Sequence, residues 1–134
     1  RMRQYCENAL TVAKFLESSD KIASVRYPAL PGNEHYERAQ KYLPMGTSGV
    51  MSIDIKGGRA PAMKFMDSLK LACNEVHVAD IRTCVLHPAS ETHRQLTDEQ
   101  LVAAGIEPGM VRISVGLENV EDIIADLKQA LAQI

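Results

Sequence analysis

The sequence has no tryptophan, few cysteines and no long uninterrupted run of apolar residues. The three cysteines, Cys6, Cys73 and Cys84, are far apart, odd in number and form no CxxC pair, which argues against a disulfide scaffold or a zinc knuckle. No apolar segment approaches the length that a membrane-spanning helix needs. Unpaired thiols fit a reducing compartment, and we therefore expect a cytoplasmic protein with no membrane partner.

The sequence also lacks a strong net charge of either sign. Its 134 residues carry 15 basic and 17 acidic side chains, for a formal net charge of −2. It has no basic surplus and no basic patch rich in aromatic residues, so we expect no nucleic-acid partner. Hydrophobic residues make up 46% of the chain, which is near the globular average and is enough for one domain with a sizeable core.

Apolar residues near the N-terminus follow the spacing of a helix. One face of this helix would carry Tyr5, Ala9, Val12, Ala13 and Leu16. No capping residue precedes Arg1, so two interpretations stay open at this point: a helix that begins further upstream, and a frayed terminus.

The rest of the chain alternates between expected strands and helices. Period-two patterns predict strands over residues 22–27, 50–55 and 110–115, with two short strand-like runs at 76–78 and 83–86. Helical spacing and capping signals predict helices over residues 34–43, 61–69, 97–105 and 119–131. We expect an α+β fold with about four mostly antiparallel strands and with helices packed mainly on one face.

One arginine of the last expected strand is a candidate binding residue. Arg112 lies between Val111 and Ile113 and would point to the sheet face opposite these apolar residues. Its planar, permanently charged guanidinium can hold a carboxylate with two hydrogen bonds, which suits an amino-acid or keto-acid ligand. The alternative is a surface arginine, free or paired with a nearby Glu or Asp, and spacing alone favours this alternative.

Other residues of chemically useful types are weaker candidates. Metal-ligating side chains occur at Asp80, Cys84, His87 and His93. The six-residue separation of the two histidines fits no common zinc pattern, so we expect no metal site. The glycine pair at 57–58 lacks the Lys-Ser/Thr of a phosphate-binding P-loop, and no base is placed beside the Cys84 thiol.

Two motifs resemble a known family. Residues 112–118 read R-I-S-V-G-L-E, and residues 49–53 read G-V-M-S-I. Both motifs, and residues 87–131 as a whole, resemble the C-terminal end of the Cys/Met-metabolism family of pyridoxal-phosphate (PLP) enzymes. The resemblance covers essentially the whole chain and implies the C-terminal domain of a fold-type I PLP-dependent transferase.

Residues 80–83, D-I-R-T, followed by H-P-A-S at 87–90, look most like the O-acetylhomoserine sulfhydrylase branch of that family. This branch implies a cytoplasmic homotetramer that uses PLP to replace the acetate of O-acetylhomoserine with sulfide, giving homocysteine for methionine and cysteine biosynthesis. Two alternatives stay open. One is a cystathionine γ-synthase, a γ-lyase or a methionine γ-lyase of the same family, and the other is a non-catalytic α+β module that binds an amino acid.

The resemblance also implies roles for individual residues. Arg112 matches the arginine that holds the substrate α-carboxylate, and Thr92 matches the threonine of a Thr-His pair near the active site. His77 and Val78 match a segment that helps to hold the same carboxylate. Because the family usually has Ser or Asn at the position of His77 and Gly at that of Ala79, we expect contact from the Val78 backbone N–H rather than from the His77 side chain.

The lysines do not match the family's cofactor-binding segment. None of the seven follows the Ser-x-Thr-Lys pattern of the Schiff-base lysine. The resemblance therefore implies that residues 1–20 are the end of an inter-domain helix, that residues 21–134 form the C-terminal small domain, and that the PLP-binding large domain lies outside this chain. We expect no catalytic residue here and no activity from these residues alone.

Overall fold

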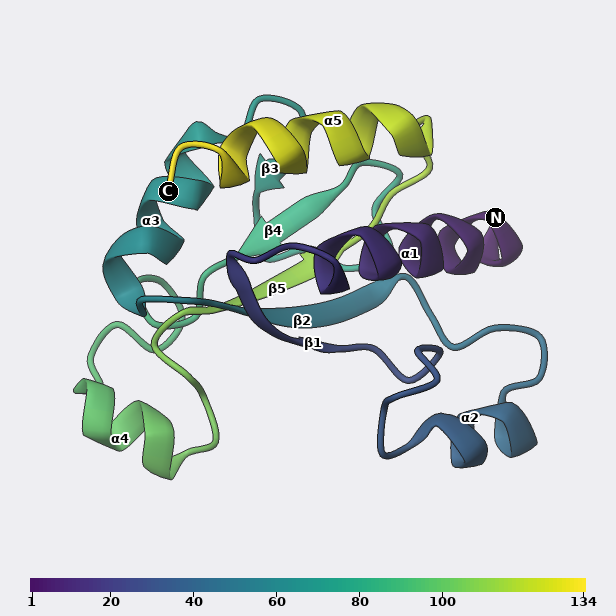
Figure 1. Cartoon of the computed structure of the whole chain (residues 1–134), viewed down its shortest axis with the longest axis horizontal. Coiled ribbons are helices and arrows are strands. Elements are labelled where there is room, and N and C mark those ends of the chain that lie inside the picture. Colours follow the sequence, from purple (N-terminus) through teal and green to yellow (C-terminus); the bar gives the residue numbers. More distant parts are fainter.

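The computed structural model describes all 134 residues as one α+β layer structure (Figure 1). The helices are α1 (Met2–Glu17), α2 (Tyr36–Tyr42), α3 (Arg59–Ser68), α4 (Asp98–Ala103) and α5 (Val120–Leu131). The strands are β1 (Ile22–Arg26), β2 (Val50–Ile55), β3 (Cys73–Asn74), β4 (Cys84–Leu86) and β5 (Met110–Ser114). None of the helices combines the length and apolar character that crossing a bilayer requires.

The five strands form one sheet in the order β1-β2-β5-β4-β3. All neighbours are antiparallel except β3 and β4, which run parallel. The expected α+β class and mostly antiparallel sheet are thus confirmed, with five strands in place of about four. The additional strand is β3, whose two residues are too short to give a periodic signal.

Helices α1, α3 and α5 cover one face of the sheet, whereas α2 and α4 extend from its ends (Figure 1). Apolar positions of β2 and β5 point into this layer, where Ile53, Val111 and Ile113 are fully buried against the helices. The helical stripe expected near the N-terminus is confirmed, because its five residues are all buried in α1. The core therefore occupies one side of the sheet and leaves Arg112 on the other.

Capping chemistry fixes the start of two helices. Thr97 and Gln100 form a reciprocal capping box at α4, as their spacing predicts. Asn119 accepts a hydrogen bond from the Glu121 N–H at the start of α5. Arg1 precedes α1 without a side-chain cap.

The prediction of a strand at residues 76–78 is wrong. The chain leaves the sheet after Glu75, whose N–H donates to the Val85 carbonyl, and residues 75–83 form a loop between β3 and β4. Val76 and Val78 are more than half exposed, so these two apolar side chains neither pack in the core nor belong to a strand of the sheet. A three-residue alternation cannot distinguish a strand from a loop whose position depends on distant contacts.

Candidate functional site

Arg112 lies in the middle of β5, between β2 and β4. Its backbone is paired with Ser52 on one side and Leu86 on the other, so the sheet fixes its position. The side chain points away from the helical layer, and its Nη2 donates a hydrogen bond of 2.6 Å to the carbonyl oxygen of Val76. No Asp or Glu of the chain forms an ion pair with Arg112, which leaves most of its N–H groups available to a ligand.

The loop of residues 75–83 lies over this face of the sheet and carries the other expected carboxylate contact. The backbone N–H groups of Val76, His77 and Val78 donate no hydrogen bond within the chain. Ala79 then adopts a left-handed conformation with φ +58°, and its N–H donates to Ser114 Oγ at 3.1 Å. This segment therefore presents free backbone donors next to the carbonyl that holds Arg112.

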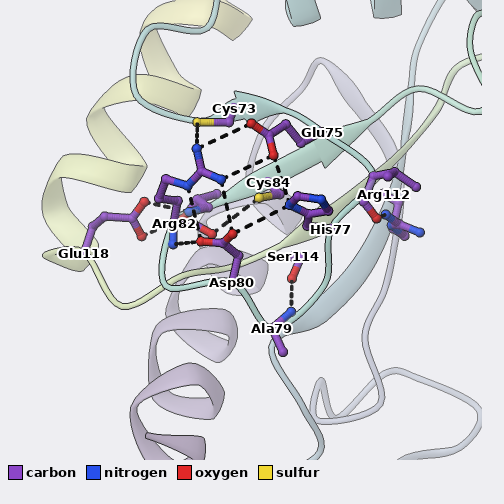
Figure 2. Close-up of polar contacts among 12 residues, drawn as sticks. Cys73, Glu75, His77, Ala79, Asp80, Arg82, Cys84, Arg112, Ser114 and Glu118 are labelled. Atoms are coloured by element: carbon purple, nitrogen blue, oxygen red, sulfur yellow. Dashed lines mark hydrogen bonds and ion pairs between the residues drawn. The ribbon is translucent and has the colours of Figure 1, made fainter.

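His77 faces charged side chains of its own loop (Figure 2). Its Nδ1 lies 3.0 Å from Glu75 Oε2 and 3.7 Å from Asp80 Oδ2. Arg82 reaches the same two carboxylates, with distances of 3.3 Å to Glu75 Oε2 and 3.2 Å to Asp80 Oδ2. Hydrogen bonds from the Arg82 side chain and backbone lower the pKa of Asp80 to about 2.

Thr92 lies on the exposed loop that follows β4. Its hydroxyl is 2.9 Å from His93 Nδ1, and no hydrogen bond joins it to Arg112 or to the 75–83 loop. His87, at the start of the same loop, is fully buried between Ser90 Oγ and the Pro108 carbonyl, each at 2.8 Å. The structure thus brings Arg112 together with the loop of His77 and Val78, and it leaves Thr92 at the surface.

The remaining candidates do not assemble into sites. No three His, Cys, Asp or Glu side chains are grouped as ligands for one metal ion. Gly58 precedes α3 as a simple turn, and the adjacent Arg59 pairs with Asp98 at 2.5 Å. Burial raises the pKa of the Cys84 thiol, and the His87 imidazole is already occupied by its own partners, so neither group is set up for nucleophilic chemistry.

Two sets of polar interactions around the 75–83 loop were not predicted from the sequence. Arg82 gathers Glu75 and Asp80 around His77, and Glu118 accepts hydrogen bonds from both the N–H and the hydroxyl of Thr83. The signal was present in the D-I-R-T and R-I-S-V-G-L-E motifs that contain these residues. The contact between Glu118 and Thr83 could not be assigned from the sequence because the two residues are 35 positions apart. Arg82 is close in sequence to Asp80 and Glu75, but exposed charges at such spacings do not by themselves indicate an ion pair.

The chain by itself offers no site that fits PLP. The seven lysines lie at the surface, six of them exposed and Lys21 half-buried, so none is desolvated in a pocket where it would form a Schiff base. No lysine contacts Arg112 or the 75–83 loop. A PLP Schiff base at this site would therefore not be formed by a lysine of this chain.

Comparisons with known proteins agree with the geometry. The sequence model of the family described as Cys/Met metabolism PLP-dependent enzyme matches residues 1–132. An O-acetyl-L-homoserine sulfhydrylase of Thermus thermophilus is 46% identical over 132 residues, which are 98% of this chain and 31% of that protein. An L-methionine gamma-lyase of Porphyromonas gingivalis is 45% identical over 131 residues, covering 98% of this chain and 33% of that protein.

A solved structure has the same fold. A crystal structure from Campylobacter jejuni, assigned as an O-acetylhomoserine (thiol)-lyase and containing N'-pyridoxyl-lysine-5'-monophosphate, superposes with a TM-score of 0.90 at 38% identity. The match covers 98% of this chain and 31% of that one. The chain thus spans about a third of the length of the relatives that it matches.

The matches extend over nearly the full chain, and they include the strand of Arg112 and the loop that holds it. Identity above 40% to curated proteins and a TM-score of 0.90 make the relationship one of family and not of fold alone. The chain belongs to the family of Cys/Met metabolism PLP-dependent enzymes.

Proposed function

We propose that the chain is the C-terminal, substrate-binding domain of a PLP-dependent enzyme that replaces the acetate of O-acetylhomoserine with sulfide and forms homocysteine. Residues 1–20 would be the end of an inter-domain helix and residues 21–134 the small domain. The PLP, its Schiff-base lysine and the other catalytic groups would come from the remaining part of the enzyme. These 134 residues alone would bind no PLP covalently and would release no acetate.

The observation that carries the proposal is the state of Arg112. Its backbone is fixed by two neighbouring strands, its guanidinium is free of carboxylate partners, and its one intramolecular bond goes to a neutral carbonyl. Such an arginine can take an α-carboxylate in a two-point contact. We propose that the N–H of Val78 adds a further donor, and that His77 and Thr92 border the same substrate.

The holding of the carboxylate would fix the orientation of the amino acid. A substrate held by its carboxylate presents its Cα–H to the base in a single direction. Arg112 would thus position the substrate and would not itself transfer a proton. The domain would therefore affect substrate affinity and alignment, whereas PLP supplies the electron sink when it is bound elsewhere in the enzyme.

A methionine γ-lyase is the second candidate. The relative from Porphyromonas gingivalis that carries this name is nearly as similar to the chain as the Thermus sulfhydrylase. Both activities need the α-carboxylate clamp, so Arg112 does not separate them. We favour the sulfhydrylase because residues 80–83 read D-I-R-T.

The test uses the enzyme that contains this domain together with its PLP-binding part. Purified enzyme is assayed for homocysteine from O-acetylhomoserine and sulfide, and for α-ketobutyrate and methanethiol from methionine. Homocysteine formation with little methionine breakdown supports the proposal. Efficient methionine breakdown without use of sulfide would establish the lyase instead. The absence of both activities would overturn both assignments and leave a cystathionine enzyme of the family or the amino-acid-binding module.

The role of Arg112 is tested in the same enzyme. We expect Arg112→Ala to raise the KM for O-acetylhomoserine by about 100-fold, because a charge-assisted two-point contact is lost. Arg38→Ala is the matched control, since Arg38 is an exposed arginine of α2 whose side chain has no polar partner. An unchanged kcat/KM in Arg112→Ala would contradict the role in carboxylate binding.

The proposal also covers assembly and location. As a member of this branch, the whole enzyme would be a cytoplasmic homotetramer with O-acetylhomoserine and sulfide as its small-molecule partners. Size-exclusion chromatography with light scattering on the whole enzyme measures the first property directly. A monomeric mass with full activity would contradict it.

A further inference from the structure

Arg82 holds together both ends of the segment that carries the free backbone donors (Figure 2). Its Nη1 and Nη2 lie 3.4 and 3.3 Å from the two carboxylate oxygens of Glu75, before the segment. Its Nε and Nη2 lie 3.3 and 3.2 Å from the two oxygens of Asp80, after the segment. We call these three residues the Arg82 clasp.

The backbone of Arg82 also takes part in the clasp. Asp80 Oδ1 also accepts the N–H of Arg82 at 2.9 Å, so this carboxylate is fixed by both the side chain and the main chain of the same residue. His77, inside the segment, adds a third group near both carboxylates. Each ion pair of Arg82 taken alone would contribute little to stability, because it lies at an exposed surface. A single guanidinium that binds two carboxylates at two points each nevertheless fixes their positions relative to each other.

The segment inside the clasp has few other attachments. Val76, His77 and Val78 donate no backbone hydrogen bonds, and their side chains are exposed. At its start, the Glu75 N–H donates to the Val85 carbonyl. At its end, the Ala79 N–H donates to Ser114 Oγ, and the Tyr5 hydroxyl lies 3.2 and 3.1 Å from the carbonyl oxygens of Ala79 and Asp80. The position of residues 76–78 therefore depends on the residues that flank them.

Arg112 depends on the same segment. The only hydrogen-bond partner of its side chain within the chain is the carbonyl of Val76, the residue directly after Glu75. A shift of Glu75 moves this carbonyl and with it the direction of the guanidinium. Arg82 does not contact Arg112, so any effect of the clasp on Arg112 must pass through the Val76 backbone.

We propose that Arg82 is a positioning residue of the carboxylate-binding site: by gripping Glu75 and Asp80 it fixes the Val76 carbonyl that orients Arg112 and the Val78 N–H that completes the site. This inference rests on the proposed function of Arg112. In this proposal Arg82 acts through the loop and does not itself bind the substrate. Its charge is used within the loop and is not offered to a ligand.

The first arm of the test measures the loop directly in this chain and needs no activity. Hydrogen exchange of the Ala79 N–H, which is bonded to Ser114 Oγ, reports whether the loop stays in place. We expect Arg82→Met to accelerate this exchange about fivefold, because the segment opens more often when the clasp is removed. The amides of Ile123 and Leu127 in the buried face of α5 should exchange as before, which excludes general unfolding.

The second arm measures substrate use in the whole enzyme. We expect Arg82→Met to raise the KM for O-acetylhomoserine about five- to tenfold with kcat nearly unchanged, because the binding geometry is disturbed and the catalytic groups are not. Arg82→Lys keeps the positive charge but cannot bind both carboxylates at two points each, so its KM should lie between those of the unmodified enzyme and Arg82→Met. Arg38→Met is the control for the loss of an exposed arginine.

The two arms separate the inference from the function on which it rests. Faster exchange at Ala79 together with a higher KM supports the positioning role. Faster exchange with an unchanged KM overturns the positioning role of Arg82, and the kinetics of Arg112→Ala then decide separately whether Arg112 holds the carboxylate. Unchanged exchange at Ala79 in Arg82→Met overturns the clasp, whatever the kinetics.

Discussion

Glu118 and Thr83 are joined by two hydrogen bonds, which connect the end of the R-I-S-V-G-L-E motif at 112–118 to the end of the D-I-R-T motif at 80–83. One carboxylate oxygen of Glu118 accepts the backbone N–H of Thr83 at 2.6 Å, and the other accepts its hydroxyl at 3.0 Å. The same Thr83 hydroxyl accepts the N–H of Gly116 at 3.0 Å. The loop that lies over Arg112 is therefore attached at its far end to the segment that directly follows β5.

The first prediction concerns this attachment. Glu118→Ala leaves the N–H and hydroxyl of the fully buried Thr83 without their acceptor, and we expect the free energy of unfolding to fall by about 1–3 kcal/mol. Glu118→Gln should cost less, since its amide oxygen still accepts one bond. Urea unfolding measures both changes. Glu107→Ala, an exposed carboxylate with no side-chain partner, is the control, and an equal effect there would contradict the assignment.

The second prediction concerns Gly116, which lies directly against the backbone of the 75–83 loop. A Cβ at this position would lie 2.5 Å from the carbonyl oxygen of Ile81 and 2.5 Å from the carbonyl carbon of Arg82. Because both are backbone atoms that cannot rotate away, Gly116→Ala should destabilise the fold by about 1–3 kcal/mol. Gly32→Ala meets no atom within 4 Å and should leave the midpoint of thermal unfolding nearly unchanged.

The third prediction follows the protonation of Asp80. Hydrogen bonds from Arg82 lower its pKa to about 2 in the folded chain, against about 3.9 in an unfolded one. The ionised carboxylate therefore contributes stability above about pH 4, and this contribution is lost as the pH falls toward 2. Carbon-detected NMR titration of the Asp80 carboxyl measures its midpoint. Arg82→Met should move the midpoint up toward the ordinary range, and an unmoved midpoint would show that Arg82 is not the cause.

The fourth prediction concerns Asp126 of α5, which is buried and accepts three consecutive backbone N–H groups. These belong to Lys70, Leu71 and Ala72, at distances of 2.8, 2.9 and 2.9 Å. Asp126→Asn replaces one acceptor oxygen with a donor that faces these N–H groups, so the free energy of unfolding should fall by about 1–3 kcal/mol. Chemical denaturation measures it. Asp67→Asn at an exposed site of α3 should change stability by no more than about 0.5 kcal/mol.

Much of the fold could be predicted because its signals are local. The apolar spacing of α1 and α5, the alternation of β2 and β5 and the capping residues Thr97 and Asn119 each lie within about ten residues of chain. Most of the fully buried residues of these elements are the ones that the spacing indicates, with Ala130 of α5 and Ser114 of β5 as exceptions. The short strand at residues 76–78 was the failure, because three residues carry too little periodic information.

The sequence by itself determined the α+β class, the apolar layer of helices against one sheet face, and the motifs that relate this chain to its family. The tertiary structure alone decided which residues meet. Arg112 and Val76 are 36 residues apart, and their contact exists because β5 pairs with β4, from whose neighbour β3 the loop begins. Pairing between distant segments depends on the packing of the whole core, and no local pattern of charges encodes that Arg112 meets the Val76 carbonyl and stays free of carboxylates.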